Sequence, residues 1–435
     1  MSEVANPAFG ADAGASTSIE TKPAFTRYDA GWVVLCIGMA IGSGVVFLPI
    51  QMGVKGALVS SISLAISYPV IYMLSKLFIQ SLSASETCDN YAQIITQYLG
   101  KNWGVALGII YFLMLLKGML AYAGTITQDA ASYLQTFGVT SQSLGSSVWF
   151  IAAIIGFMIL IASSGERLLF KVSGPLIFIK LGIVVFLGIA MVPYWNFKNL
   201  EIVAPEPFAL FRDVLLTLPF SLFSILFVQI LSPMNIAFRK VEKDPKVATF
   251  RALRASRYAY TILTVSVLFF CFSFLLSTNH DDALYAQSHN ISGLALAAKV
   301  IPGTSVQVLS TLLDVAAIFS AFFGVYLGFQ DAVRGILVNF VERFTTPGDS
   351  FKKVLPWVIA FTSLTILVNW VLLGYSTMSL VQITIPVYGL VSCLIPGYLV
   401  YKVPRLHHLR SSAAVIVIIY GLLLMLVPIF KLMEG

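Results

Sequence analysis

The sequence predicts an all-α polytopic membrane protein with eleven transmembrane helices. Three observations predict this class: hydrophobic residues make up 58% of the 435 residues, mean hydropathy is +0.88, and only 11% of the residues are charged. Soluble domains carry about 25% charged residues, so lipid must be the solvent for most of this apolar surface. A helix needs about 20 apolar residues to cross a bilayer, and the chain offers eleven such stretches.

The eleven stretches are joined by short polar connections, and the third is long enough to tilt or to project beyond the bilayer. They cover residues 31–53, 57–80, 103–135, 147–164, 172–192, 214–237, 258–277, 305–330, 354–373, 379–400 and 412–430. We expect residues 1–28 to form a disordered cytoplasmic tail without a cleaved signal, because they hold no apolar run. Residues 29–402 are expected to form a core of ten spans, and residues 403–435 carry the eleventh transmembrane helix. Between spans 7 and 8, we expect one short helix, Ala283 to Lys299, over the outer mouth.

Basic residues are distributed unevenly between the two sets of connections. About 20 of the 27 lysine and arginine residues fall on one set, including the run between Arg239 and Arg257. Because cytoplasmic connections carry the excess of Lys and Arg, we expect a cytoplasmic N-terminus. An odd number of spans then places the C-terminus in the periplasm. Topology thereby explains the net charge of +7, and no nucleic-acid partner is expected.

Cysteine and histidine show no pattern of a metal site. The four cysteines, Cys36, Cys88, Cys271 and Cys393, are scattered without paired spacing. All four histidines lie in polar connections between spans. Small buried residues are the ordinary role of such cysteines. We predict no metal site, no cofactor and no obligate protein partner.

Two spans carry signals that a helix is interrupted halfway through the bilayer. The first span has three glycines within residues 38–44, which lower the cost of unwinding and admit a ligand close to the backbone. The sixth span has Pro219 and Pro233 on either side of several polar side chains. Because proline removes a backbone donor and frees a carbonyl, we expect an interruption at about residues 223–228.

The two spans open two halves of five spans each, 1–5 and 6–10. Five is odd, so the second half is inverted relative to the first. Discontinuous helices at matching places in two halves indicate the midplane binding site of a secondary transporter. Free N–H groups at a half-helix N-terminus suit a carboxylate, and freed carbonyl groups suit an ammonium, so an amino acid zwitterion fits both. For either span by itself, the alternative is close packing at glycine or a simple proline kink.

Three ionisable residues lie well inside the predicted spans: Lys117 in the third, Lys180 in the fifth and Asp314 in the eighth. Such a residue costs about 2.5–3.5 kcal/mol at the bilayer centre, so we expect all three to face protein and to be candidates for ion coupling. Asp314 is the expected counter-ion of Lys180, and Lys117 competes for it. The alternative is a static Lys–Asp pair that ties helices together. Asp129, near the outer end of the third span, is expected in a vestibule or at a solvated helix end.

The residues of the first interruption also carry a resemblance. Residues 40–49, AIGSGVVFLP, resemble the first-span signature of the bacterial hydroxy and aromatic amino acid permeases, and more narrowly of their serine/threonine branch, within the amino acid/polyamine transporter superfamily. Phe223-Ser224 and the segments 287–294, 324–331 and 401–404 match as well, so that the resemblance covers nearly the whole chain after residue 28.

The resemblance implies a LeuT-like fold, which is the inverted five-plus-five arrangement, with an eleventh helix added. It implies symport of a small amino acid with a proton or sodium ion across the bacterial inner membrane. The substrate is expected to be serine or a similar hydroxy or sulfur amino acid, and the alternative is an aromatic amino acid such as tryptophan or tyrosine. The residues implied in substrate binding are Ile41, Gly42, Ser43, Gly44, Tyr122, Thr125, Phe223, Ser224 and Phe227.

The same resemblance implies a role for Lys180. Spans 1, 5 and 8 surround the sodium position of sodium-driven relatives, so the ammonium of Lys180 would replace the ion there and could load and release a proton. Ser320 and backbone carbonyls near Ala40 are the groups that would bind sodium in the alternative. No inner connection holds the clustered carboxylates or histidines of a lipid-processing enzyme. The repeated filter residues of a channel are missing too, so we expect a transporter and not an enzyme.

Overall fold

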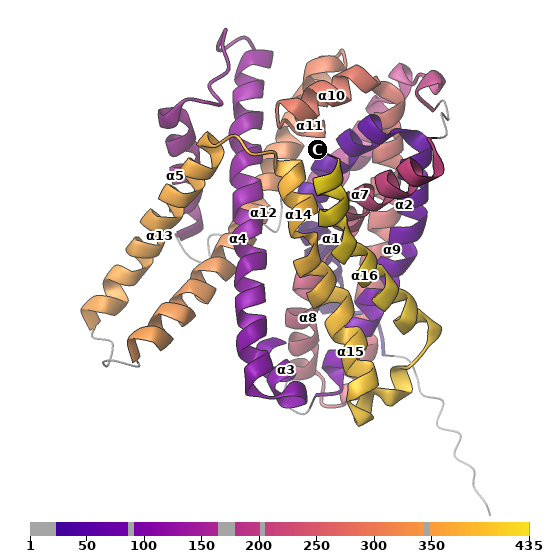
Figure 1. The fold of residues 1–435 in the computed structure, drawn as a ribbon, viewed down its shortest axis with the longest axis vertical. Helices are drawn as coiled ribbons and strands as arrows, with labels where there is room; N and C mark the ends of the chain where they lie inside the picture. Colours follow the sequence, from indigo (N-terminus) through magenta and orange to yellow (C-terminus); the bar gives the residue numbers. More distant parts are fainter. Residues whose placement is uncertain (1–22, 86–90, 164–178, 201–204, 343–348, 435) are drawn as a thin grey trace, which may run out of the picture.

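The computed structural model describes residues 23–85, 91–163, 179–200, 205–342 and 349–434, and helices dominate these ranges (Figure 1). Within these described ranges, eight helices are long and apolar enough to cross a membrane. They are Gly44–Ser83, Ile109–Thr136, Pro207–Val241, Pro245–Ser277, Thr304–Gln330, Lys353–Leu372, Thr377–Lys402 and Ser412–Met433, with shorter apolar helices at Val148–Ser163 and Ile179–Tyr194. The predicted all-α membrane class is therefore confirmed, whereas the count of eleven spans stays a prediction.

The described ranges contain the following α-helices. In chain order they are α1 (Arg27–Ala40), α2 (Ser43–Ser83), α3 (Tyr91–Leu99), α4 (Lys101–Thr136), α5 (Val148–Ser163), the helix within Ile179–Tyr194, α7 (Pro207–Ile225), α8 (Val228–Val241), α9 (Pro245–Ser277), α10 (His280–Ser288), α11 (Gly293–Val300), α12 (Thr304–Glu342), α13 (Asp349–Leu372), α14 (Thr377–Gly389), α15 (Ile395–Lys402) and α16 (Ser412–Met433). A five-residue π-helical turn, Leu390–Leu394, joins α14 to α15.

The helices pack in two groups. One group surrounds α2, which contacts α7 and α9, while α1 and α8 also pack on α9. In the other group α4 and α5 pack against α12 and α13, around buried residues such as Ile155 and Phe322. Figure 1 shows α5 and α13 on the side of α4 that faces away from α9. The second group meets α2 of the first group through α12.

Helix α2 contains a kink that separates two predicted spans. Its backbone leaves the helical region at Gly56, where φ is 83° and ψ is 170°. This is a conformation that glycine adopts readily and other residues avoid. Gly56 lies between the predicted stretches 31–53 and 57–80, so the expected boundary is found as a kink and not as a loop.

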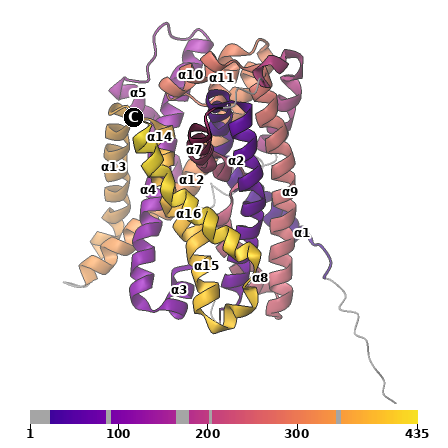
Figure 2. The same cartoon turned by 45° about the vertical axis from the view of Figure 1, so that its right-hand side comes forward.

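The segment between α9 and α12 differs from its prediction. In place of one helix from Ala283 to Lys299 it forms two, α10 and α11, which lie across one end of the molecule (Figure 2). The chain turns between them at Asn290, where φ is 55°, a left-handed conformation that Asn tolerates. The amide oxygen of Asn290 accepts a hydrogen bond from the backbone N–H of Thr377 at 3.2 Å, which fastens the turn to α14.

Candidate functional site

The first predicted interruption is present between α1 and α2. Helix α1 ends at Ala40, and α2 begins at Ser43. Ile41 (φ −74°, ψ 86°) and Gly42 (φ −152°, ψ −140°) are not helical. The carbonyl groups at the end of α1 and the N–H groups at the start of α2 therefore lack the partners of a continuous helix.

The second predicted interruption lies between α7 and α8. Helix α7 ends at Ile225 and α8 begins at Val228; Leu226 between them is extended (φ −80°, ψ 127°), and Phe227 is also not helical (φ −130°, ψ 29°). The expectation of an interruption at residues 223–228 is confirmed. Pro219 and Pro233 lie inside α7 and α8, away from the gap, so the prolines do not themselves mark where the helix stops.

The two interruptions touch through their backbones. A Cβ atom on Gly44 would lie 2.0 Å from both the carbonyl carbon and the carbonyl oxygen of Phe223, and 2.2 Å from the backbone nitrogen of Ser224. No side chain fits such a gap, since an ordinary contact is 3.4–4 Å. Only glycine at residue 44 lets the start of α2 approach the end of α7 this closely.

Lys180 closes the end of α1. Its ammonium donates to the carbonyl oxygens of Gly38 at 2.8 Å and Ile41 at 3.0 Å, and to the Oγ of Ser320 on α12 at 2.9 Å. Its side chain is fully buried. An ammonium has three donors, and all three are used here. The arrangement links the fifth predicted span to the first and the eighth, among the groups named as alternative sodium ligands.

The expected Lys180–Asp314 pair is not formed, which corrects the sequence prediction. Asp314 instead accepts hydrogen bonds from the hydroxyl groups of Tyr133 at 3.0 Å and Ser292 at 3.3 Å. Asp314 and Ser320 both lie on α12, six residues apart, which is about 9 Å along the helix axis. A lysine bound to Ser320 therefore lies about one and two-thirds helical turns away from Asp314.

Lys117 does not compete for Asp314 either. Its ammonium lies over the ring of Phe223 at 4.2 Å and over the ring of Tyr388 at 5.2 Å from the ring centroids. The two rings meet edge to face at 4.6 Å. Aromatic faces attract a buried cation electrostatically. Lys117 thus lies beside the second interruption, and no hydrogen-bond acceptor contacts its ammonium within the described ranges.

The other implied substrate residues are distributed around the two interruptions. Tyr122 on α4 reaches the first: its hydroxyl oxygen lies 3.4 Å from the position of a Cβ on Gly42. Thr125 is buried, but its hydroxyl donates to the Ala121 carbonyl of its own helix, and no hydrogen bond of the described residues joins it to either interruption. Phe227 is fully buried in the second interruption. The side chain of Ser43 lies outside what the structure describes.

Hydroxyl groups form a link between α7 and α2 that the sequence did not reveal. Ser224, at the end of α7, exchanges a hydrogen bond with the hydroxyl of Tyr68 at 2.9 Å. One turn earlier, Ser221 pairs with Ser63 at 2.9 Å. All four side chains are buried. In the sequence, the polar residues Ser63 and Tyr68 on adjacent turns of the second predicted span indicate a buried polar face. The sequence did not indicate that this face packs against α7.

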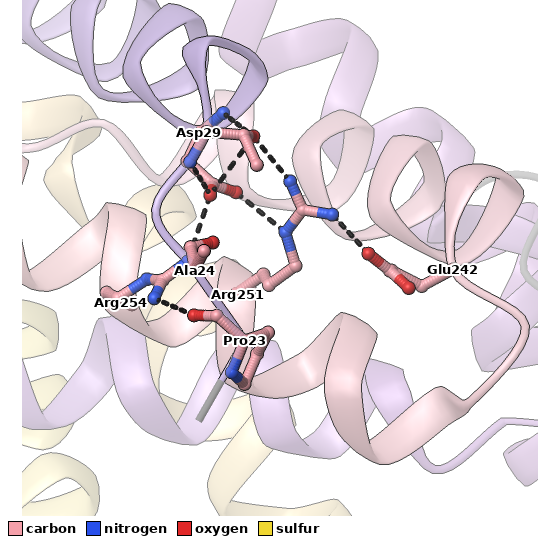
Figure 3. Close-up of polar contacts among 7 residues, drawn as sticks. Pro23, Ala24, Asp29, Glu242, Arg251 and Arg254 are labelled. Carbon is pink, nitrogen blue, oxygen red and sulfur yellow. Dashed lines mark hydrogen bonds and ion pairs between the residues drawn. The ribbon is translucent and has the colours of Figure 1, made fainter. Parts of the chain in front are cut away.

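At the other end of α1 a buried ionic cluster fixes the helix to α9 (Figure 3). Arg251 donates to Asp29 at 2.8 Å and also pairs with Glu242. Arg254 donates to Asp29 at 2.9 Å and to the carbonyl oxygens of Pro23 and Ala24. Part of the basic run at 239–257 therefore has a structural role besides topology. Residues 23–26, which we assigned to the tail, are held against α9.

The charge balance of this cluster keeps Asp29 ionised. Burial by itself would raise the pKa of Asp29. Hydrogen bonds from Arg251 and from the backbone of Thr26, together with the charges of Arg251 and Arg254, outweigh burial and lower that pKa below its ordinary value. The carboxylate is also part of a capping box with Thr26 at the start of α1.

Asp129 is not at a solvated helix end, which corrects a second prediction. Its side chain is fully buried, and its Oδ1 accepts a hydrogen bond from the backbone N–H of Ser292 at 2.8 Å. The residues around it, Tyr133, Ser292 and Asp314, were not recognised as a group because they come from three distant segments. Within the described part of the chain, no cluster of three or more His, Cys, Asp or Glu residues could hold a metal ion.

Known proteins resemble the chain over almost its full length. A serine transporter of Escherichia coli is 43% identical over 411 residues, which are 93% of this chain and 92% of that protein. A threonine/serine transporter of Yersinia enterocolitica is 25% identical over 97% of this chain and 99% of its own length. Among solved structures, a manganese transporter of Eremococcus coleocola matches the fold with a TM-score of 0.50 and 14% identity, covering 94% of this chain and 85% of that one.

Residues 29–362 match the tryptophan/tyrosine permease family. The match begins at the Asp29 cluster and contains both interruptions and Lys180. The prediction of a multi-pass membrane transporter of the permease type, and not an enzyme, is thereby confirmed. The chain belongs to the tryptophan/tyrosine permease family.

Proposed function

We propose that this protein is a secondary active transporter that carries serine, or a similar hydroxy or sulfur amino acid, across the bacterial inner membrane. The observation that carries the proposal is the backbone contact between the two interruptions at Gly44 and Phe223. The contact brings N–H groups at the start of α2, which lack a helical partner, beside carbonyl groups at the end of α7, which lack one too. They suit the carboxylate and the ammonium of a zwitterion. The names of the relatives support the choice of serine.

The proposed architecture has eleven spans, with spans 1–5 and 6–10 as inverted repeats and the eleventh helix at residues 403–435. The N-terminus lies in the cytoplasm and the C-terminus in the periplasm, because the larger share of basic residues is then on the inner side. Under this orientation α10 and α11 cover the outer end, and the Asp29 cluster lies at the inner end. Motion of α1 away from α9 would open the site to the cytoplasm.

The coupling ion is proposed to be a proton carried by Lys180. In the described geometry its ammonium satisfies the carbonyl groups of Gly38 and Ile41, which would otherwise be free. Loss of the proton removes the charge that holds these carbonyls. It thereby changes the stability of the interruption at which substrate binds. Sodium is the alternative ion, with Ser320 and the same carbonyls as ligands, and Lys117 and Asp314 stay candidates for a further coupling role.

Uptake of labelled serine into proteoliposomes tests the proposal. We expect uptake to rise with an inward proton gradient and to be independent of sodium. Lys180→Gln should abolish gradient-driven accumulation but preserve exchange of labelled for unlabelled serine, while Lys402→Gln, a substitution of an exposed lysine, should behave as wild type. Gradient-driven uptake by Lys180→Gln with unchanged pH dependence would exclude Lys180 as the proton carrier.

A competition panel identifies the substrate. Unlabelled L- and D-amino acids are added against labelled serine at two pH values, with and without sodium. We expect serine and small hydroxy or sulfur amino acids to compete. Phe223, Tyr388 and Phe227 line the second interruption with aromatic side chains, which favours an aromatic substrate as the alternative. Competition by tryptophan or tyrosine alone would establish that alternative.

A further inference from the structure

Two buried carboxyl groups lie where the α10–α11 segment docks on the transmembrane helices. Asp129 comes from α4 and Asp314 from α12, and both side chains are fully buried. Ser292, the N-cap residue of α11, bridges them: its backbone N–H donates to Asp129 and its hydroxyl donates to Asp314. The hydroxyl of Tyr133 donates to the second oxygen of Asp314. The second oxygen of Asp129, Oδ2, is buried without a hydrogen-bond partner in the structure.

No positive charge on a described residue compensates this pair. Within the described ranges, no lysine, arginine or histidine forms an ion pair with either carboxyl group. The two groups are neighbours, because both are hydrogen-bonded to the same residue, Ser292. Two ionised carboxylates at such a distance, away from water, would repel and would lack solvation. A single proton shared between them removes the repulsion and supplies the missing donor for Asp129 Oδ2.

The titratable groups on the surrounding elements do not change this balance. Tyr133 is the only other such group bonded to the pair in the described structure. On α10 and α11, Asp281, His289 and Lys299 are exposed, and Lys299 contacts Tyr285. On α2, Lys55 is occupied by Asp213 on α7 and by Glu434 beyond α16.

The bridge at Ser292 connects the pair to a larger docking surface. Gly293, the next residue, is pressed against α2, where a Cβ would lie 3.0 Å from the Val46 carbonyl oxygen. Ala283 of α10 packs in the same way against Gly53 of α2. The α10–α11 segment therefore covers the half of the interrupted first span that follows Gly42. Loss of the hydrogen bonds from Ser292 to Asp129 and Asp314 would allow the α10–α11 segment to move away from α2.

We propose that Asp129 and Asp314 form a proton-binding site, distinct from Lys180, that latches the α10–α11 segment over the transport path. With one proton bound, one carboxyl O–H donates to the other carboxylate, and Ser292 stays bridged between them. When that proton passes to outer water, two carboxylates remain, and the segment undocks so that water can solvate them. The placement of this site on the outer side of the membrane, and the identification of the space beneath it as the transport path, rest on the proposed function. The proton-dependent docking itself does not require a particular substrate.

Cysteine labelling tests the latch. The native cysteines are replaced by alanine, and Leu294→Cys places a thiol at a fully buried position of α11. Its labelling by a membrane-impermeant maleimide is measured in proteoliposomes from about pH 5 to about pH 9, a range that covers release of a buried carboxyl proton. Rates are divided by those of Leu284→Cys, a solvent-exposed position on α10, because thiols themselves react faster at higher pH.

We expect the corrected rate to rise with pH by up to about tenfold per pH unit, as for release of one proton. Asp129→Asn and Asp314→Asn each supply an amide donor in place of the shared proton, so either variant should keep the rate low at all pH values. Asp281→Asn, at an exposed carboxylate, should retain the wild-type profile. Size-exclusion profiles of the variants exclude misfolded protein.

A corrected wild-type rate that does not change with pH would overturn the proposal, and so would a wild-type pH profile in both Asn variants. The labelling needs no substrate, so its outcome is separate from the transport experiments. A pH-dependent latch in a protein that transports no amino acid would refute the proposed function alone. Proton-driven uptake through Lys180 with a pH-independent latch would refute this inference alone.

Discussion

Gly44→Ala perturbs the contact between the two interrupted helices with a single methyl group. The added carbon would lie 2.0 Å from the Phe223 carbonyl group, where 3.4–4 Å is ordinary contact. The obstructing atoms are backbone, so no side-chain rotation relieves the overlap. The start of α2 or the end of α7 must move by more than an ångström. Overpacking of this kind costs about 1–3 kcal/mol where the surroundings can adjust, and more where they cannot.

We expect Gly44→Ala to lower serine uptake in proteoliposomes by a factor of at least about 10, which corresponds to about 1.4 kcal/mol. Binding of serine, measured by scintillation proximity in detergent, should weaken by a similar factor because the binding groups themselves are displaced. Gly42→Ala should have a smaller effect, since its nearest neighbours would be the Tyr122 hydroxyl at 3.4 Å and Ala321 at 3.5 Å. Gly182→Ala is the matched control, because a Cβ there meets nothing within 4 Å.

The result that would refute this reasoning is a Gly44→Ala protein that folds and transports serine as the Gly182→Ala control does. The contact between the interruptions would then be dispensable, and the binding site would have to lie elsewhere. Loss of transport in both variants would point instead to a general intolerance of helix glycines to substitution. Size-exclusion profiles of the two variants establish that each protein is folded.

The remaining predictions concern the cluster that holds α1 to α9. Asp29→Asn leaves Arg251 and Arg254 without their shared carboxylate. Removal of one partner from a buried ion pair destabilises a protein by about 3–5 kcal/mol. The thermal unfolding temperature in detergent should therefore fall by several degrees. Glu242→Gln, at the more exposed partner of Arg251, should lower the free energy of unfolding by no more than about 1 kcal/mol. Equal shifts of the unfolding temperature in the two variants would contradict a special role for Asp29. Because the pKa of Asp29 is lowered in the folded protein, its stabilisation is complete above the ordinary carboxyl pKa of 3.8 and is lost as the pH falls through the lowered value. Wild type and Asp29→Asn should therefore differ at neutral pH and converge only in acid, and a difference that vanishes between about pH 5 and about pH 7 would argue against the lowered pKa.

Local features of the sequence determined the class of fold and the places where two helices stop. Long apolar stretches can only be helices in lipid, because every backbone group must be satisfied within the segment. Glycines at 38–44 and a polar face between two prolines predicted interruptions that the structure places at residues 41–42 and 226–227. The neighbours of Lys180 followed from the resemblance, since a family fold fixes which spans adjoin.

Pairings between distant side chains were decided only by the tertiary structure. Asp314 was assigned to Lys180 because both are charges inside spans. The register of α12 instead places Ser320 at the lysine and Asp314 about one and two-thirds turns away, where Ser292 bonds both Asp314 and Asp129. Asp129 was expected in water because it lies near a predicted helix end, and α11 covers it. The hydropathy of a segment indicates which of its residues must be buried, but it does not indicate which other segment packs against them. Burial and partners of the charged groups therefore depend on how the helices are packed.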